Sequence, residues 1–203
     1  MPSPGVSKVK KMVCFDIGNV LIKLGKSTKE IFDIEDEEEL HFLLKCFSHG
    51  NINSLFFLKK LQSIIKRKYF SINEIENIFI HKRIDYTHEG ILELIADLKE
   101  KGIRIAIISN TNELHWSYLE KILPIEKFDE ILLSHIYQVE KPDKRIYQIL
   151  EERTGLKDRE ILFFDDIQEN IYTALSLGWN ANKVPLLNPV EFMRKILNEN
   201  KIL

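Results

Sequence analysis

The stretch that decides the fold is Lys11-Met12-Val13-Cys14-Phe15-Asp16-Ile17-Gly18-Asn19-Val20-Leu21-Ile22. The apolar run before Asp16 is too short for a typical helix and predicts a fully buried strand. An unpaired buried charge is very costly, so we expect Asp16 to meet a cation or hydrogen-bond donors. Gly18 and Asn19 then predict a sharp turn that lets the backbone approach a ligand. The stretch suits a reactive centre and, equally, a structural turn after a strand.

Length and composition limit the class of protein. A chain of 203 residues with a formal net charge of -2 suits one domain, or one domain with an insertion, and gives no electrostatic case for nucleic acid. No apolar stretch approaches a membrane span, and Met1 to Lys8 lack the apolar core of a signal peptide. Cys14 and Cys46 are expected to remain thiols, as in a reducing cytosol. We therefore expect a cytoplasmic protein with no nucleic-acid or membrane partner, as a monomer or weak dimer.

The segment from Ser27 to about Tyr86 reads as helices without a strand between them. Apolar residues at helical spacing predict helices over 37–47 and 56–65. Ser71-Ile72-Asn73-Glu74 has the form of a capping box before a third helix, and residues 49–53 read as a loop. We therefore predict a small helical subdomain over 25–86, with 10–24 and 87–203 forming the rest of the fold.

From Thr87 onward, predicted strands and helices alternate. Strands are expected at 103–108, 130–133 and 160–164 and near Val184, and helices at 91–98, 112–123, 143–154, 169–177 and 189–198. Such alternation predicts an α/β fold, a three-layer Rossmann-like core with a parallel sheet between helices. In these sheets, ligands gather at the carboxyl ends of the strands.

Polar side chains follow three of the predicted strands. Asp16 ends the first, Ser109-Asn110 the second and Asp165-Asp166 the fourth, and Lys141 precedes a helix between them. Converging carboxylates repel unless a cation joins them, and all-oxygen ligation is the preference of Mg²⁺. A hydroxyl and backbone N–H groups at a helix start bind phosphate, and a lysine supplies a point charge. These residues therefore predict a site for Mg²⁺ and a phosphate group.

These motifs resemble those of the haloacid dehalogenase superfamily of aspartate-nucleophile phosphohydrolases. The four matching stretches are Phe15-Asp16-Ile17-Gly18-Asn19-Val20, Ile107-Ile108-Ser109-Asn110, Lys141-Pro142, and Phe163-Phe164-Asp165-Asp166 leading to Asn170-Ile171. They occur in the family's order and span residues 13 to 171. The predicted helices between the first and second motifs match the helical cap of the family.

The resemblance implies a role for each motif residue. The implied catalytic residues are Asp16 as nucleophile, Ser109 as phosphate ligand and Lys141, which steadies the nucleophile and the phosphoryl group. The implied Mg²⁺ ligands are Asp16, the backbone carbonyl of Gly18, Asp166 and Asp165, the last with the smaller effect. The implied substrate contacts are Gly18, Asn19, Ser109, Asn110 and Lys141.

The position two residues after the nucleophile departs from the family pattern. Most phosphatases of the superfamily carry there an aspartate that protonates the leaving group, whereas this chain has Gly18. This puts general acid–base catalysis in doubt, but not metal binding. Residues 109–115 and 141–147 are similar to bacterial phosphatases that act on α-D-glucose 1-phosphate, a branch that also has Gly-Asn here. The resemblance thus implies Mg²⁺-dependent hydrolysis of small phosphate monoesters, with sugar 1-phosphates favoured, through an aspartyl phosphate on Asp16.

Two other functions stay open. Gly18 permits a non-catalytic or weakly active protein that binds a phosphate ligand, although four matching motif residues favour an enzyme. The superfamily also contains 2-haloacid dehalogenases, which need no metal and would gain nothing from the repulsion between Asp165 and Asp166.

Outside the motifs, His115 could help to donate a proton, but we expect it to be a solvated helix residue. Phe57 is expected in the core of the cap.

Overall fold

The computed structural model describes residues 11–67 and 69–203, so the expectation for Met1 to Lys8 lies outside the described residues. Its core is a sheet of five parallel strands in the order β5-β4-β1-β6-β7. The strands are β1 (Met12–Phe15), β4 (Arg104–Ser109), β5 (Glu130–Leu133), β6 (Ile161–Asp165) and β7 (Asn180–Lys183). The last strand thus ends just before Val184, near which it was expected.

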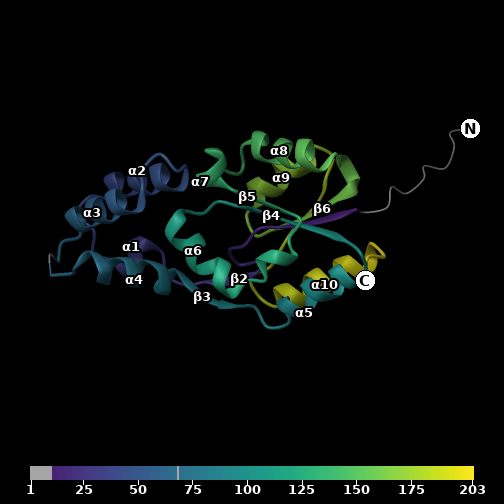
Figure 1. Cartoon of the computed structure of the whole chain (residues 1–203), viewed down its shortest axis with the longest axis horizontal. Helices are drawn as coiled ribbons and strands as arrows, with labels where there is room; N and C mark the ends of the chain where they lie inside the picture. The colour runs from purple at the N-terminus through teal and green to yellow at the C-terminus, as the bar shows by residue number, and fades with distance from the viewer. Residues whose placement is uncertain (1–10, 68) are drawn as a thin grey trace, which may run out of the picture.

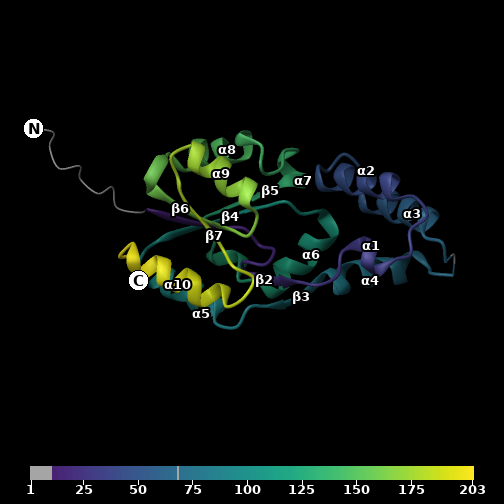
Figure 2. The same cartoon turned by 180° about the vertical axis from the view of Figure 1, so that it is seen from behind.

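Helices cover both faces of this sheet and make three layers (Figures 1 and 2). Alternate residues of β1 show why: Val13 and Phe15 pack into one apolar cluster, and Met12 and Cys14 into another. The helices on the first face are α5 (Ile91–Glu100), α6 (Glu113–Ile122) and α10 (Pro189–Glu199). Those on the second are α8 (Lys144–Thr154) and α9 (Gln168–Ser176). The predicted α/β class and its three layers are confirmed.

Short helical turns complete the connections of the core. These are α7 (Ser134–Tyr137), η1 (Ile125–Lys127) and η2 (Asp158–Glu160). In the described part of the chain, every helix is too short or too polar to cross a membrane.

Four helices, inserted between β2 (Ile22–Leu24) and β3 (Ile84–Thr87), lie at one end of the molecule (Figure 1). They are α1 (Thr28–Ile31), α2 (Glu37–Ser48), α3 (Ser54–Ile64) and α4 (Ile72–Arg83). From here on we call residues 25–86 the cap. The pairing of β2 with β3 was not predicted, and the boundary expected after Tyr86 falls inside β3. Asp85 and Tyr86 are exposed, so this short strand lacks the apolar signal of a buried one.

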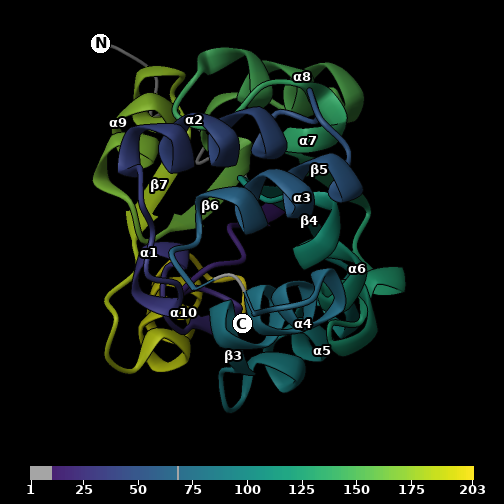
Figure 3. The same ribbon diagram turned by 90° about the vertical axis from the view of Figure 1, so that its left-hand side faces the viewer.

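The cap has an aromatic core that continues into the main fold. Phe57 is fully buried, as predicted. The centroid of its ring lies 4.2 Å from the ring centroid of Phe47 and 5.0 Å from that of Phe79. Phe79 also stacks on His115 of α6, with ring centroids 4.4 Å apart. His115 is therefore only partly exposed rather than fully solvated as expected, because α4 packs against α6 and its Phe79 shields one face of the imidazole (Figure 3).

Candidate active site

The predicted site residues meet at the carboxyl ends of the three central strands. Asp16 follows β1, Ser109 ends β4, and Asp165 ends β6, with Asp166 next to it. The chain runs from β1 to β4 and β5 on one side, then crosses to β6 and β7 on the other. β1 is thus the point where the strand order reverses, and ligands bind outside such points in open α/β sheets.

Lys141 lies at the centre of this cluster and is only 3% exposed. Its Nζ lies 2.8 Å from Oδ1 of Asp16 and 2.6 Å from Oδ2 of Asp165. Burial alone would lower the pKa of Lys141, but the two carboxylates outweigh it and raise that pKa, so the ammonium stays charged. The lysine therefore holds the side chain of Asp16 in one place.

Three carboxylates face this one ammonium. Asp16, Asp165 and Asp166 each offer an oxygen, and these oxygens all lie within 4.8 Å of one another. Burial, with a contribution from Asp165, raises the pKa of Asp16 to about 6 against the opposing effect of Lys141. Burial also raises the pKa of Asp166. A divalent cation with a preference for oxygen ligands would relieve this surplus of negative charge, so the donor set fits Mg²⁺.

The two adjacent aspartates differ in what they contact. Both oxygens of Asp165 are already engaged: Oδ1 accepts from the backbone N–H of Ile167, Oδ2 from Lys141, and the amide of Asn170 lies 3.0 Å from both. Asp166 is half-buried and accepts one side-chain hydrogen bond, 2.8 Å long, from Asn19. The surroundings therefore fit Asp166 as a metal ligand and Asp165 as the residue that positions Lys141.

The loops after β4 and before α8 are joined by one side chain. The amide of Asn110 donates to the carbonyl of Lys141 and accepts from its N–H, both at 2.8 Å. Asn110, expected as a substrate contact, thus fixes the backbone of Lys141. Ser109 is only 3% exposed and lines the cavity of the site, and its hydroxyl makes no hydrogen bond within the described ranges, which suits a phosphate ligand.

Ser134 is a supporting residue that sequence reasoning did not identify. Its hydroxyl accepts from the N–H of Thr111 at 3.0 Å and donates to the carbonyl of the same residue at 2.9 Å. It thereby holds the loop that follows Ser109. Its place directly after β5, at the same edge of the sheet, was a signal that could have identified it.

The turn after the nucleophile is shaped by Asn19 and Leu24. Asn19 has φ of 55°, and its side chain donates to Asp166 and accepts from the N–H of Leu24 at 3.2 Å. Asn19 was expected as a substrate contact, but its amide links Asp166 to β2. The φ of Gly18 lies outside the left-handed region, but a Cβ added there would lie 2.8 Å from Cδ1 of Leu24.

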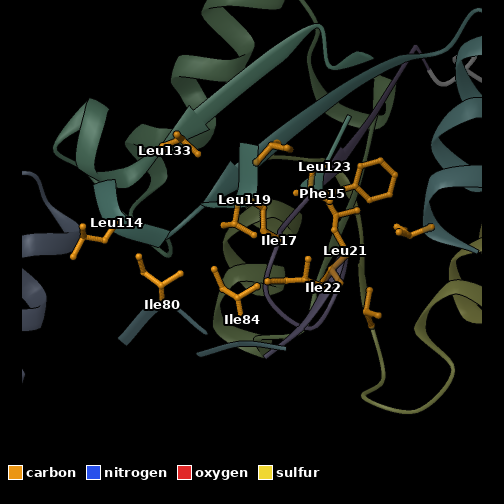
Figure 4. Packing of buried hydrophobic residues seen from close by; sticks show 14 of the residues in the cluster. Phe15, Ile17, Leu21, Ile22, Ile80, Ile84, Leu114, Leu119, Leu123 and Leu133 are labelled. Carbon is orange, nitrogen blue, oxygen red and sulfur yellow. The ribbon is translucent and has the colours of Figure 1, made fainter. Parts of the chain in front are cut away.

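The site opens into a cavity of about 430 Å³ between the core and the cap. Its polar end holds the motif residues, and its apolar end is formed by side chains that include Ile17, Ile22, Leu24, Ile84 and Leu119. Figure 4 shows Ile17, Ile22, Ile84 and Leu119 gathered where β2, β3 and α6 meet. Arg83 from the end of α4 also lines this cavity, although sequence reasoning gave it no role. The run His81-Lys82-Arg83 does not by itself indicate which side chain faces inward.

His115 lines the cavity but is poorly suited to donate a proton. Burial lowers its pKa to about 4, so the imidazole is neutral near pH 7. One ring nitrogen lies 3.3 Å from the carbonyl of Phe79 and the other 3.0 Å from the amide of Asn112. Both ring nitrogens are therefore occupied by partners within the protein.

Comparisons with known proteins give one matching family model and several relatives. The family model for haloacid dehalogenase-like hydrolases matches residues 10–178. Acyl-CoA dehydrogenase family member 10 of Mus musculus is 25% identical over 191 residues, which is 86% of this chain and 18% of that protein. A glyceraldehyde 3-phosphate phosphatase of Methanothermobacter thermautotrophicus is 33% identical over 89 residues, or 43% of this chain and 39% of that protein. The chain thus spans well under half the length of these two relatives.

Solved structures share the whole fold. A haloacid dehalogenase family enzyme of Bacteroides thetaiotaomicron has a TM-score of 0.81 at 24% identity, covering 92% of this chain and 99% of that one. The same enzyme was solved in complex with magnesium and inorganic phosphate, with a TM-score of 0.79 at 23% identity over 91% of this chain and 98% of that one. A hydrolase of Porphyromonas gingivalis has a TM-score of 0.79 at 22% identity, covering 93% of this chain and 98% of that one.

Proposed function

This chain belongs to the haloacid dehalogenase-like hydrolases, and we propose that it hydrolyses small phosphate monoesters with Mg²⁺ as its cofactor. The observation that carries the proposal is the buried Lys141 between Asp16 and Asp165, beside Asp166 and the unbonded hydroxyl of Ser109. One relative named above is a phosphatase, and the enzyme of Bacteroides thetaiotaomicron binds magnesium and inorganic phosphate.

The residues that would hold Mg²⁺ are Asp16, Asp166 and, through its backbone carbonyl, Gly18. When bound, the ion would offset the negative charge of the carboxylates and of the phosphate, so that the two could approach each other. Asp165 keeps Lys141 in place, and Asn19 keeps Asp166 in place. These hydrogen bonds restrict the side chains that surround the site for the ion.

The reaction runs in two steps on Asp16. A carboxylate oxygen of Asp16 attacks phosphorus in line, a new O–P bond forms, and the P–O bond to the leaving group breaks. The departing oxygen takes its proton from water, because position 18 carries no acid. A second water then attacks the phosphorus of the aspartyl phosphate, and the bond between phosphorus and Asp16 breaks. The proton that this water loses neutralises the hydroxide left by the first step, and inorganic phosphate and the carboxylate of Asp16 are released. Lys141, the hydroxyl of Ser109 and the backbone N–H groups of the turn stabilise the charge on the phosphoryl oxygens.

Gly18 favours substrates with good leaving groups. Sugar 1-phosphates release an anomeric oxygen, which is less basic than an ordinary alkoxide. We therefore propose them as the preferred esters, and residues 25–86 as the cap that covers the leaving group. A cap that closes over the site would exclude bulk water during the transfer.

The test is a screen of the purified protein with Mg²⁺ against sugar 1-phosphates, sugar 6-phosphates, nucleotides and acyl phosphates. Release of phosphate that depends on Mg²⁺ supports the proposal, and 1-phosphates should exceed the matching 6-phosphates. Absence of turnover on every ester would favour the non-catalytic alternative. Halide release from 2-haloacids without metal would favour the dehalogenase, for which the close approach of three carboxylates has no use.

A further inference from the structure

Arg83 places a positive charge in the active-site cavity that the proposed mechanism does not use. It is the last residue of α4, half-buried, and lines the cavity together with Ser109, Lys141 and Asp166. Among the described residues, no carboxylate lies within 4.0 Å of its guanidinium, whose one hydrogen bond is a long contact of 3.5 Å to the carbonyl of Gly25. An arginine cannot lose its charge in proteins, so the cavity holds a cation without an ion-pair partner.

The backbone around Arg83 is fixed where the two connections of the cap cross. The N–H of Gly25 donates to the carbonyl of Arg83 at 2.8 Å, and that of Lys26 to the carbonyl of Lys82 at 2.9 Å. A Cβ on Gly25 would lie 2.3 Å from the carbonyl oxygen of Lys82, so only glycine permits this approach. The base of the arginine is therefore anchored, and its side chain projects from a fixed point.

A second cavity of about 410 Å³ continues from Arg83 into the cap. One face of α2 lines it with His41, Leu44, Lys45 and Ser48, which recur at helical spacing. Arg83 belongs to both cavities, as do Asn110, Thr111 and His115 on the core side. A ligand that extends from the first cavity into the second therefore passes the residues that line both, Arg83 among them.

The charged residues that line the second cavity are mainly positive. Lys45 and Arg83 line the second cavity, and among the described residues neither forms an ion pair. Glu140 is the one acidic residue in that lining, and it already contacts Ser48 at 3.2 Å and His49 at 3.6 Å. The leaving-group side of the site is thus built to receive negative charge in addition to the transferred phosphate.

We propose that Arg83 selects phosphate esters whose leaving group carries a second anionic group, either a carboxylate or another phosphate. This inference rests on the proposed phosphatase function and names its substrate class. The apolar wall around Ile84 and Leu119 accommodates the carbon skeleton, while the guanidinium pairs with the anionic group by charged hydrogen bonds. Glutamine at position 83 keeps a polar side chain but loses that charge.

The experiment compares three esters that share the same sugar. They are α-D-glucose 1-phosphate, with a neutral leaving group, α-D-glucuronic acid 1-phosphate, with a carboxylate, and α-D-glucose 1,6-bisphosphate, with a second phosphate. We expect at least one anionic ester to exceed glucose 1-phosphate in kcat/KM by about tenfold or more, the size expected for one charged hydrogen bond. The anionic ester with the higher kcat/KM shows whether Arg83 prefers a carboxylate or a phosphate on the leaving group.

Variants assign this preference to one residue. Arg83→Gln should lower the ratio of anionic to neutral kcat/KM about tenfold, and Arg83→Lys should restore part of it. Lys82→Gln is the matched control, because it removes the same charge from the adjacent, exposed position that lines neither cavity. Its ratio should equal that of the wild type.

Two results would overturn the inference. One is a wild-type enzyme that does not prefer either anionic ester, a comparison that needs no variant to fold. The other is an equal loss on all three esters in Arg83→Gln, which would mean that Arg83 contacts the transferred phosphate or only supports the fold.

A binding measurement distinguishes failure of the phosphatase proposal from failure of the proposed selectivity of Arg83. Calorimetry on Asp16→Asn with Mg²⁺ gives the affinities of the three esters without turnover, and the same ratio should depend on Arg83. If no ester is hydrolysed but this ratio holds, the phosphatase proposal fails while the anion selectivity of Arg83 stands. Equal affinities for all three esters would overturn the selectivity.

Discussion

The side chain of Leu24 lies against Gly18, where it would contact the Cβ of any other residue at position 18. A Cβ built on Gly18 would lie 2.8 Å from Cδ1 and 3.4 Å from Cγ of Leu24. Leu24 is tied to the neighbouring turn, because its N–H donates to the side chain of Asn19 at 3.2 Å. Position 18 thus lacks an acidic side chain, and the space next to it is filled by an apolar one.

This arrangement predicts how activity depends on the leaving group. General acid–base help is worth about 10²–10⁴-fold, so wild-type kcat/KM should fall steeply as the pKa of the leaving alcohol rises. Gly18→Asp should flatten this dependence in part, because the terminal methyl of Leu24 must move to admit the new side chain, and Gly18→Asp with Leu24→Ala should flatten it further and raise activity on alkyl phosphates. A series of phosphate esters measures the slopes, and Leu24→Ala alone is the control. A flat slope in the wild type would mean that another group supplies the proton.

Asp16→Asn should abolish turnover and leave the fold intact. The amide keeps the shape of the carboxyl group but is a poor nucleophile, and Lys141 keeps its contact with Asp165. We expect kcat to fall by about 10⁴-fold or more, as for other nucleophile replacements. Circular dichroism and thermal unfolding check the fold of the variant. Substantial residual kcat in the folded protein would contradict covalent catalysis at Asp16.

The sequence predicted that most of the candidate site residues would lie together, because the signals for their positions are local. A short apolar strand, one polar residue at its end and regular alternation of elements placed Asp16, Ser109 and Asp165 at one edge of the sheet. The sequence could not show that the side chain of Asn110 hydrogen-bonds to the backbone of Lys141, or that the side chain of Asn19 donates to Asp166. The partners in these two pairs lie 31 and 147 residues apart along the chain.

The strand β3 and the shielding of His115 were not predicted, and the two omissions have a common cause. The segment Ile84–Thr87 is a strand because it pairs with β2, and its exposed residues give no period of their own. His115 is covered by Phe79, which comes from a helix in a different part of the chain. Both depend on how the cap docks onto the core, which no local pattern encodes.

Removal of divalent metal should stop the reaction. Activity should vanish with excess EDTA and return when Mg²⁺ is added in excess of the chelator. Asp166→Ala should raise the Mg²⁺ concentration needed for half-maximal activity sharply or remove activity, because its carboxylate is the one of the adjacent pair that is open to a ligand. A titration of activity against Mg²⁺ measures this. Full activity of the wild type in metal-free buffer would contradict the site and favour a dehalogenase.

Asp165→Ala should act first on stability. Its carboxylate accepts from Lys141, Ile167 and Asn170 in a fully buried setting, so its loss leaves Lys141 with one partner for its charge. Breaking a buried ion pair by removing one partner costs about 3–5 kcal/mol. Urea unfolding gives the free energy of unfolding, and Asp166→Ala, which lies next to it and is half-buried, serves as the control. Equal and small losses in the two variants would contradict the positioning role of Asp165.

His115 should make the fold less stable in mild acid. Burial lowers its pKa to about 4 in the folded protein, and the positive charge of Arg83 acts in the same direction, whereas the carbonyl of Phe79 opposes them. In the unfolded chain the imidazole has its ordinary pKa of 6.5. Between these two values the unfolded chain binds a proton that the folded protein does not. This contribution to stability is therefore complete above about pH 6.5 and is lost as the pH falls toward 4.

The measurement compares urea unfolding of the wild type and His115→Gln at about pH 7 and about pH 5. Glutamine can still donate to the carbonyl of Phe79 but does not titrate, and the carboxylates of the site titrate in both proteins, so their effect cancels in the difference. Relative to the variant, the wild type should lose about 2 kcal/mol of unfolding free energy over this range. A difference between the two proteins that does not change with pH would mean that His115 is free to take up a proton in the folded state. It would then become the first candidate for the missing acid beside Gly18.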